Sequence, residues 1–222
     1  MQKSISLIRE AKNESYDIFH TRITEIVDKI KSTGPFRLHY TITLEKPPKM
    51  SVIPFRKEKI ALISVTSEDN SYFEIISGAD GFSGSFNVTE ALPIAYEKDW
   101  NAGEATPGVC LLTLFRKKKG IEYDAFIDRW HNGHTPLTLK IHPIYHYNRN
   151  EVTESLGNLP VLYDGIVEEH CLTRKELMNP FKFFAKSGLA PVNMIKTYFD
   201  VKSFIDYKSI ETYLVTEYHI VS

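Results

Sequence analysis

The feature that most constrains the fold of this 222-residue chain is an internal repeat at a spacing of 107 residues. Several short segments of the first half reappear in the second half at this one offset, without a gap. They are Leu7-Ile8-Arg9 with Leu114-Phe115-Arg116, Tyr16-Asp17-Ile18-Phe19 with Tyr123-Asp124-Ala125-Phe126, Arg22 with Arg129, and His39-Tyr40 with His146-Tyr147. Several matches in one register indicate a duplication. We therefore expect two repeats, residues 1–107 and 108–222, the first of them degenerate.

Each half shows the same order of predicted elements. Apolar runs rich in strand-forming residues open the halves at 4–8 and 109–115, and apolar residues at helical spacing follow. Two strands, a second helix and a last strand complete the order βαββαβ, with the last strands near 90–100 and at 211–221. A capping box, Thr173 with Glu176, marks the second helix of the second half. The predicted fold class is α+β: duplicated ferredoxin-like units whose antiparallel sheets pack as an intrachain α+β barrel.

Composition excludes several classes of partner. The formal net charge of −1 provides no uniformly basic field for holding nucleic acid. The two cysteines, Cys110 and Cys171, lie far apart in apolar stretches, which favours a reducing compartment over a disulfide framework. No apolar run approaches the roughly 18 residues that a membrane span needs. We expect a cytoplasmic protein with neither a nucleic-acid nor a membrane partner.

Ordered motifs run through residues 108–222. A helix carries the step Phe126-x-x-x-Trp130, and His134 stands ahead of Pro136 and Leu137. The remaining motif positions are Asp164, Gly165 and Glu168 in one strand, and Asp206 and Glu217 in the closing segment. With these motifs the second half resembles the EthD family of the dimeric α+β barrel superfamily. Departures are Thr135 in place of a small residue, Ile121 in place of a helix cap, and an insertion around 179–196.

The resemblance implies a range of activities. Members of the family are linked to ether degradation, and superfamily relatives include cofactor-independent monooxygenases and aromatic polyketide cyclases or dehydratases. The fold does not choose among these, because unrelated functions share one architecture. The first half has Val27 where the second half has His134, which indicates that one half alone keeps a site.

Four histidines fall within 128–147, a density that raises the question of a metal site. His131 and His134 have a spacing suited to zinc on a continuous helix, but Gly133 and the Thr135-Pro136 pair indicate a helix break between them. The stretch contains no Cys or Glu, and its one Asp opens it. We expect no metal and no cofactor. Haem held by one of these histidines, as in barrel relatives with two repeats per chain, is kept as an alternative.

The acid/base hypothesis rests on His134, because imidazole is the side chain best suited to give and take a proton under neutral conditions. Its expected partner is Glu168, because a carboxylate on a helix-facing strand surface would need a donor. The structural alternatives are that His134 caps a helix and that Glu168 lies on a solvent-facing strand. Residues expected to bind substrate are Trp130, His131, Tyr145 and Tyr147, whose alternative role is core packing.

The sequence thus predicts an EthD-like enzyme that binds a small hydrophobic or aromatic compound. Its chemistry would be cofactor-independent oxidation, or proton transfer of the cyclase or dehydratase type. A non-catalytic binding or assembly module is the competing class, and a haem-binding barrel protein is the third. A second copy of the chain, forming a homodimer, is the other candidate partner.

Overall fold

The computed structural model describes residues 1–49, 51–157, 160 and 162–222. The first half contains β1 (Gln2–Arg9), α1 (Tyr16–Lys31), β2 (Arg37–Ile42), β3 (Ile60–Ser67), α2 (Phe73–Ser77) and β4 (Phe82–Ile94). The second half opens with β5 (Val109–Phe115), α3 (Tyr123–Asp128), the π-helical segment η1 (Arg129–His134), α4 (Thr135–Ile141), β6 (Ile144–Ser155) and β7 (Gly165–Cys171). It ends with α5 (Arg174–Met178), α6 (Pro180–Phe183), α7 (Ala190–Phe204), the 3-10 turn η2 (Tyr207–Ser209) and β8 (Glu211–Val221).

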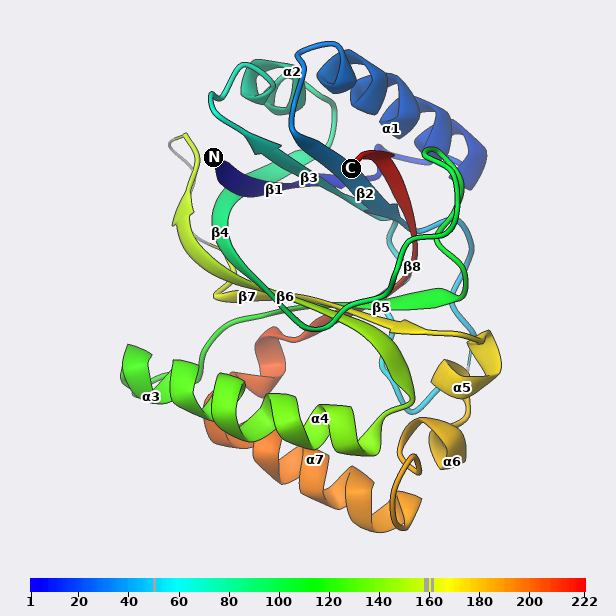
Figure 1. Cartoon of the computed structure of the whole chain (residues 1–222), viewed down its shortest axis with the longest axis vertical. Coiled ribbons are helices and arrows are strands. Elements are labelled where there is room, and N and C mark those ends of the chain that lie inside the picture. Colours follow the sequence, from blue (N-terminus) through cyan, green and yellow to red (C-terminus); the bar gives the residue numbers. More distant parts are fainter. Residues whose placement is uncertain (50, 158–159, 161) are drawn as a thin grey trace.

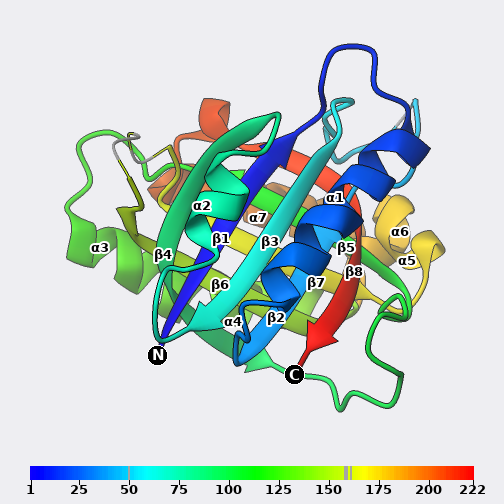
Figure 2. The same ribbon diagram turned by 90° about the horizontal axis from the view of Figure 1, so that it is seen from above.

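The described strands form a closed barrel in the order β1-β3-β2-β8-β5-β7-β6-β4, with antiparallel pairing throughout. Two seams join the halves, where β2 pairs with β8 and β4 pairs with β6. Helices α1 and α2 cover one side of the barrel, and α3, α4 and α7 cover the opposite side (Figure 1). Figure 2 shows α1 and α2 lying across β1 to β4. The predicted α+β barrel is confirmed, and its origin in a duplication stays a prediction.

Strand alternation divides the core into three apolar layers. One occupies part of the barrel interior, with residues such as Ile5, Leu112 and Ile166. The other two lie between the barrel wall and the helices of each half, around Phe19 in the first half and Phe126 in the second. Most strand residues are therefore covered on both faces, and β7 is buried along its whole length. Such strands carry two distinct interior faces, one toward the barrel and one toward the helices.

The expected helix break at Gly133 is wrong. The chain runs through α3, η1 and α4 from Tyr123 to Ile141, and Gly133 lies within the π-helical segment. A π-helical turn accommodates the residues that looked like a stop without ending the helix. The last strand of the first half also begins earlier than expected, at Phe82, and ends at Ile94.

The capping box at the start of α5 is confirmed. The Thr173 side chain accepts from the Glu176 backbone, and the Glu176 carboxylate accepts from the Thr173 backbone. Helix α1 has its own cap, because the Ser15 side chain accepts from the Ile18 backbone. No described helix combines the length and the apolar character needed to cross a membrane.

Candidate functional site

A cavity of about 320 Å³ lies between the outer face of the second-half sheet and the helices that cover it. Strands β5 and β7 form its floor, and η1, α4 and α7 form much of its roof. Most of its wall is apolar or aromatic, including Leu111, Phe115, Trp130, Tyr147, Val167 and Val201. Polar groups come from a few positions, among them His134, Thr138 and Glu169. An apolar cleft with a few converging polar groups is the usual form of a small-molecule site.

His134 is held by contacts on both ring nitrogens. Its Nδ1 lies 2.6 Å from Oδ2 of Asp200 on α7, and its Nε2 lies 3.2 Å from the Thr138 hydroxyl on α4. The ring also packs against Phe204, with centroids 5.3 Å apart. A carboxylate that accepts from Nδ1–H leaves Nε2 as the basic nitrogen. That nitrogen shares the cavity wall with Thr138.

Glu169 supplies a second titratable group to the cavity. It is on the outer face of β7, nine-tenths buried, and pairs across the sheet with Tyr147. Burial raises the pKa of its carboxyl to about 7. A carboxyl with such a pKa exchanges a proton near neutral pH, which an ordinary glutamate does not.

His142 also lines this cavity, and its imidazole is uncharged at neutral pH. Its Nδ1 donates to the Phe183 carbonyl oxygen at 2.8 Å, and its ring stacks on the Phe183 ring with centroids 4.0 Å apart. Burial lowers the pKa of the imidazole to about 4. His142 therefore acts at this site as an uncharged donor and an aromatic surface.

Trp130 is fixed over the sheet by close packing. It is 1% exposed, and its ring lies edge-on to Phe115 with centroids 5.0 Å apart. A Cβ at Gly165 would come within 2.7 Å of the Trp130 ring, so this glycine makes the approach possible. Arg149 lies over the indole at 5.7 Å and donates to the Thr135 hydroxyl at 2.8 Å. Trp130 and Tyr147 both line the cavity, and their role in binding a substrate stays a prediction.

The expected pairing of His134 with Glu168 is wrong. Alternation along β7 was predicted correctly, but Glu168 is on the face with Ile166 and points into the barrel, whereas Glu169 faces the helices. Glu168 is fully buried there, and Asn148 Nδ2 donates to its Oε2 at 3.2 Å. Burial, with the nearby Glu217 carboxyl, raises the pKa of Glu168 to about 8.

His131 and Tyr145 lie outside the cavity wall. The His131 side chain is directed toward Glu151, with 3.9 Å between its Nε2 and the carboxylate. Tyr145 donates to the Pro107 carbonyl oxygen, away from Tyr147. Simple alternation places Tyr145 and Tyr147 on one face, but a register shift between Ile144 and His146 breaks that alternation.

Sequence reasoning missed Asp200 and Glu169. Asp200 is on α7, which begins in the segment identified as an insertion, and no motif marks it. The signal for Glu169 was present, because a second carboxylate beside Glu168 in an apolar strand must lie on the opposite face.

Comparisons with known proteins identify the fold. No family model matches the chain, and no curated protein matches it. Among solved structures, an anthrone oxidase-like protein matches with a TM-score of 0.62 and 8% identity, over 99% of this chain and 93% of that one. A "Putative monooxygenase" from Fusobacterium nucleatum subsp. nucleatum matches with a TM-score of 0.51 and 8% identity, with the same coverage. At this identity, both likenesses show a shared fold.

Proposed function

We propose that this protein is an enzyme that binds a small, largely apolar ring compound in the cavity beneath α4 and α7 and removes a proton from it through His134. The observation that carries the proposal is the pair His134 and Asp200 on the wall of that cavity. Asp200 fixes the ring and favours the tautomer with the proton on Nδ1, so Nε2 is presented as a base. Membership of the EthD family, with its monooxygenase relatives, is part of the proposal.

The chemistry begins with one proton. Nε2 takes it from an acidic C–H or O–H group, and the electron pair stays on the substrate as an enolate or phenolate anion. Dioxygen is the oxidant in the oxidative version: a CH2 group and O2 give a carbonyl group and water. The names of the two structural neighbours favour this version. Cyclisation or dehydration would use the same proton removal without the oxidant.

Glu169 is proposed as the group that exchanges a second proton with the substrate. It replaces Glu168, which was the carboxylate expected to act with His134. Its carboxyl shares the cavity with His134, and its pKa of about 7 lets it donate or accept at neutral pH. The apolar wall keeps water from the anion, which strengthens every polar contact within the site. Trp130 and Tyr147 supply flat surfaces for a ring.

The two alternatives make different demands on this cavity. At about 320 Å³ it lies at the small end of ligand pockets, which suits a compact ring system and does not fit a haem macrocycle unless the helices move apart. A non-catalytic binding module needs the cavity but does not need His134 and Asp200 arranged as base and orienting carboxylate.

The two-repeat organisation is a further part of the proposal. The order βαββαβ occurs in both halves, and the segments that match at a spacing of 107 residues occupy equivalent elements. This supports a duplication with repeats at 1–107 and 108–222.

The test measures binding and turnover separately, with anthrone and a panel of fused-ring phenols as probes. Anaerobic calorimetry measures binding, and an oxygen electrode measures oxidation. We expect His134→Ala to lower kcat/KM by about 10²–10⁴-fold while binding persists. Asp200→Asn should have a smaller effect in the same direction. His131→Ala is the matched control, because this histidine is one turn earlier and outside the cavity wall. Binding without turnover, or unchanged turnover in His134→Ala, would contradict the proposal.

A further inference from the structure

One end of the barrel interior is polar. Four of the chain's eight histidines point into it, namely His39, His146, His170 and His219. Acidic side chains from three strands join them: Glu90 from β4, Glu168 from β7 and Glu217 from β8. None of these residues belongs to the cavity around His134.

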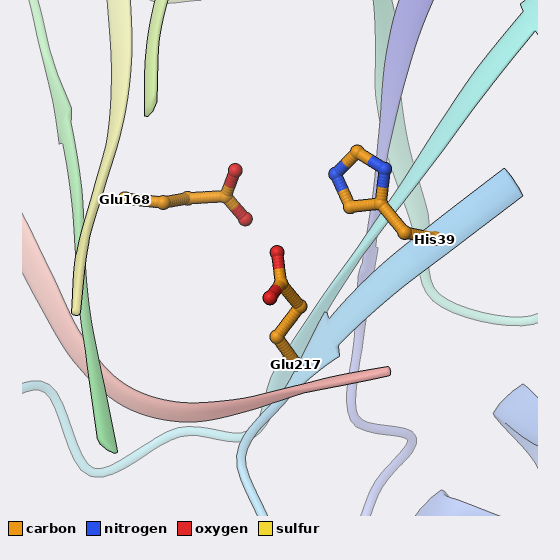
Figure 3. A group of neighbouring side chains, drawn as sticks. All are labelled: His39, Glu168 and Glu217. Atoms are coloured by element: carbon orange, nitrogen blue, oxygen red, sulfur yellow. The ribbon is translucent and has the colours of Figure 1, made fainter. Parts of the chain in front are cut away.

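Within this end, three side chains converge on one point. His39, Glu168 and Glu217 each offer one ligand atom, and these atoms lie within 4.8 Å of one another. Figure 3 shows the imidazole and the two carboxylates directed toward one another from different strands. Their residues are 9%, 0% and 2% exposed. Metal–ligand bonds of about 2.0–2.2 Å place opposite ligand atoms up to about 4.4 Å apart, so a small side-chain rotation would bring all three onto one ion.

Two of these ligand residues carry a buried atom with no hydrogen-bond partner in the described part of the chain. These atoms are Nε2 of His39 and Oε1 of Glu168. By contrast, Oε2 of Glu217 accepts from Thr106 at 2.7 Å and from Tyr96 at 2.8 Å. Leaving polar atoms buried and unpaired is costly, and the cost disappears if a ligand occupies the space between them.

The two halves of the barrel differ at one interior position, where the first half has a lysine and the second half has a cysteine. In the first half Lys3 Nζ donates to Glu90 at 2.5 Å and to Asn150 at 2.8 Å. Cys110 takes the corresponding position in the second half, 107 residues later on β5, and it is a buried neutral thiol beside Glu217. The first half therefore pairs its own Glu90 with an ammonium group, whose charge also acts on Glu168 and His39, and the second half has no lysine at the corresponding position.

We propose that His39, Glu168 and Glu217 form a binding site for a divalent first-row transition-metal ion inside the barrel. One imidazole nitrogen and two carboxylate oxygens suit Zn²⁺, Mn²⁺, Fe²⁺ or Co²⁺, whereas Mg²⁺ and Ca²⁺ favour oxygen ligands alone. The expectation that no metal binds rested on the histidines of 131–146, and this site draws its ligands from other strands.

A cavity adjoins the site. It has a volume of about 210 Å³, and its lining includes His39, Glu217, His146 and His219, together with Tyr96 and the exposed Ser222. Three protein ligands leave coordination positions free, and these would face the cavity. Water or a small anionic ligand could occupy them, as at other open metal sites.

The test uses the full chain, free of any affinity tag and treated with a chelator. Co²⁺ titration followed by visible absorption reports imidazole and carboxylate coordination, and calorimetry with Zn²⁺ reports stoichiometry. We expect one ion per chain. Glu168→Gln and His39→Gln should each weaken binding by about 100-fold or more, because loss of a ligand costs at least as much as loss of its supporting contacts.

Glu169→Gln is the matched control, since the neighbouring carboxylate points out of the barrel. It should bind the ion as tightly as the parent protein. Glu168→Gln removes an incompletely paired buried acid, so it should fold, and near-ultraviolet circular dichroism checks this. The proposal is overturned if folded parent protein takes up no ion at about 1 mM Zn²⁺ or Co²⁺, or if Glu168→Gln binds as tightly as Glu169→Gln.

Discussion

The helix layers of the two halves occupy equivalent places but are built differently. Helix α1 is regular over 16 residues, and its buried residues form a continuous apolar face against the first-half sheet. Its counterpart in the second half passes through the π-helical segment η1. Val27 on α1 is 1% exposed in apolar surroundings, whereas the equivalent His134 meets Asp200 at a cavity wall. The same fold position serves as packing in one half and as a candidate site in the other.

The difference depends on what surrounds the position. Helix α7 brings Asp200 over the second-half sheet, and π-helical turns are frequent at functional sites because they redirect side chains. A histidine at the Val27 position would meet neither a carboxylate nor a cavity in the apolar cluster of the first half. Relative to the first half, a site at this position therefore needs three differences together. They are a histidine in place of Val27, the π-helical segment η1, and the additional helix α7.

The largest expected effect tests whether the two halves unfold together. Phe19→Ala and Phe126→Ala remove equivalent, fully buried rings, and each should lower the free energy of unfolding by about 3–5 kcal/mol. Because the barrel closes across both halves, Phe19→Ala should shift the unfolding transition seen by Trp130 fluorescence in a Trp100→Phe background. If the Trp130 transition stays in place, the halves unfold as independent domains.

The next effect concerns the pH dependence of stability that His142 causes. The position equivalent to His142 in the first half is Pro35, which does not titrate. Burial lowers the pKa of His142 from 6.5 to about 4, so the unfolded state binds more protons between these values. Its contribution to stability is complete above pH 6.5 and is lost as the pH falls toward 4. His142→Asn keeps a donor for the Phe183 carbonyl, and should remove about 3 kcal/mol of this pH dependence. Urea unfolding at several pH values measures the free energy of unfolding of the parent protein and of His142→Asn. If His142 is not buried, the two proteins should show the same pH dependence.

Exchanging the residues at the equivalent position gives a smaller effect. Val27→His buries an imidazole without a partner and should cost about 2 kcal/mol. His134→Val, at a partly exposed position beside a cavity, should cost about 1 kcal/mol or less while removing turnover. Thermal unfolding and the oxygen-electrode assay measure the two effects. Equal losses of stability would indicate that the two layers are packed alike.

The smallest effect compares helix caps in the two halves. Ser15→Ala and Thr173→Ala each remove a side-chain acceptor at a helix start, and each should cost about 1 kcal/mol. Ser15→Gly should cost only a few tenths of a kcal/mol, because glycine is tolerated at this position. Urea unfolding at neutral pH measures all three. A glycine variant as unstable as the alanine variant would argue against capping as the cause.

Much of the fold follows from local patterns in the sequence. Strand alternation assigned Glu168 and Glu169 to opposite faces of β7, and the capping box located the start of α5. Alternation could not say which face of β7 looks into the barrel, because both faces are buried. Gly133 and Pro136 resembled a helix end, since a π-helical turn has no simple sequence signature.

The candidate sites depend on contacts between distant segments. Asp200 reaches His134 across 66 positions of sequence, from a helix with no recognisable motif. The convergence of His39 with Glu168 requires the strand order of the closed barrel, which places β2 and β7 around one interior. Periodicity reveals which face a residue occupies, but not which residues of other strands it will meet.

The two seams of the barrel have a consequence for how this protein responds to dilution. A barrel assembled from two chains falls apart when its concentration drops, because each seam is an association between molecules. Here β2 meets β8 and β4 meets β6 within one chain, so both seams are intramolecular. The two seams should therefore add no concentration dependence to the midpoint of unfolding. The two halves are also free to differ, since neither has to match an identical copy of itself.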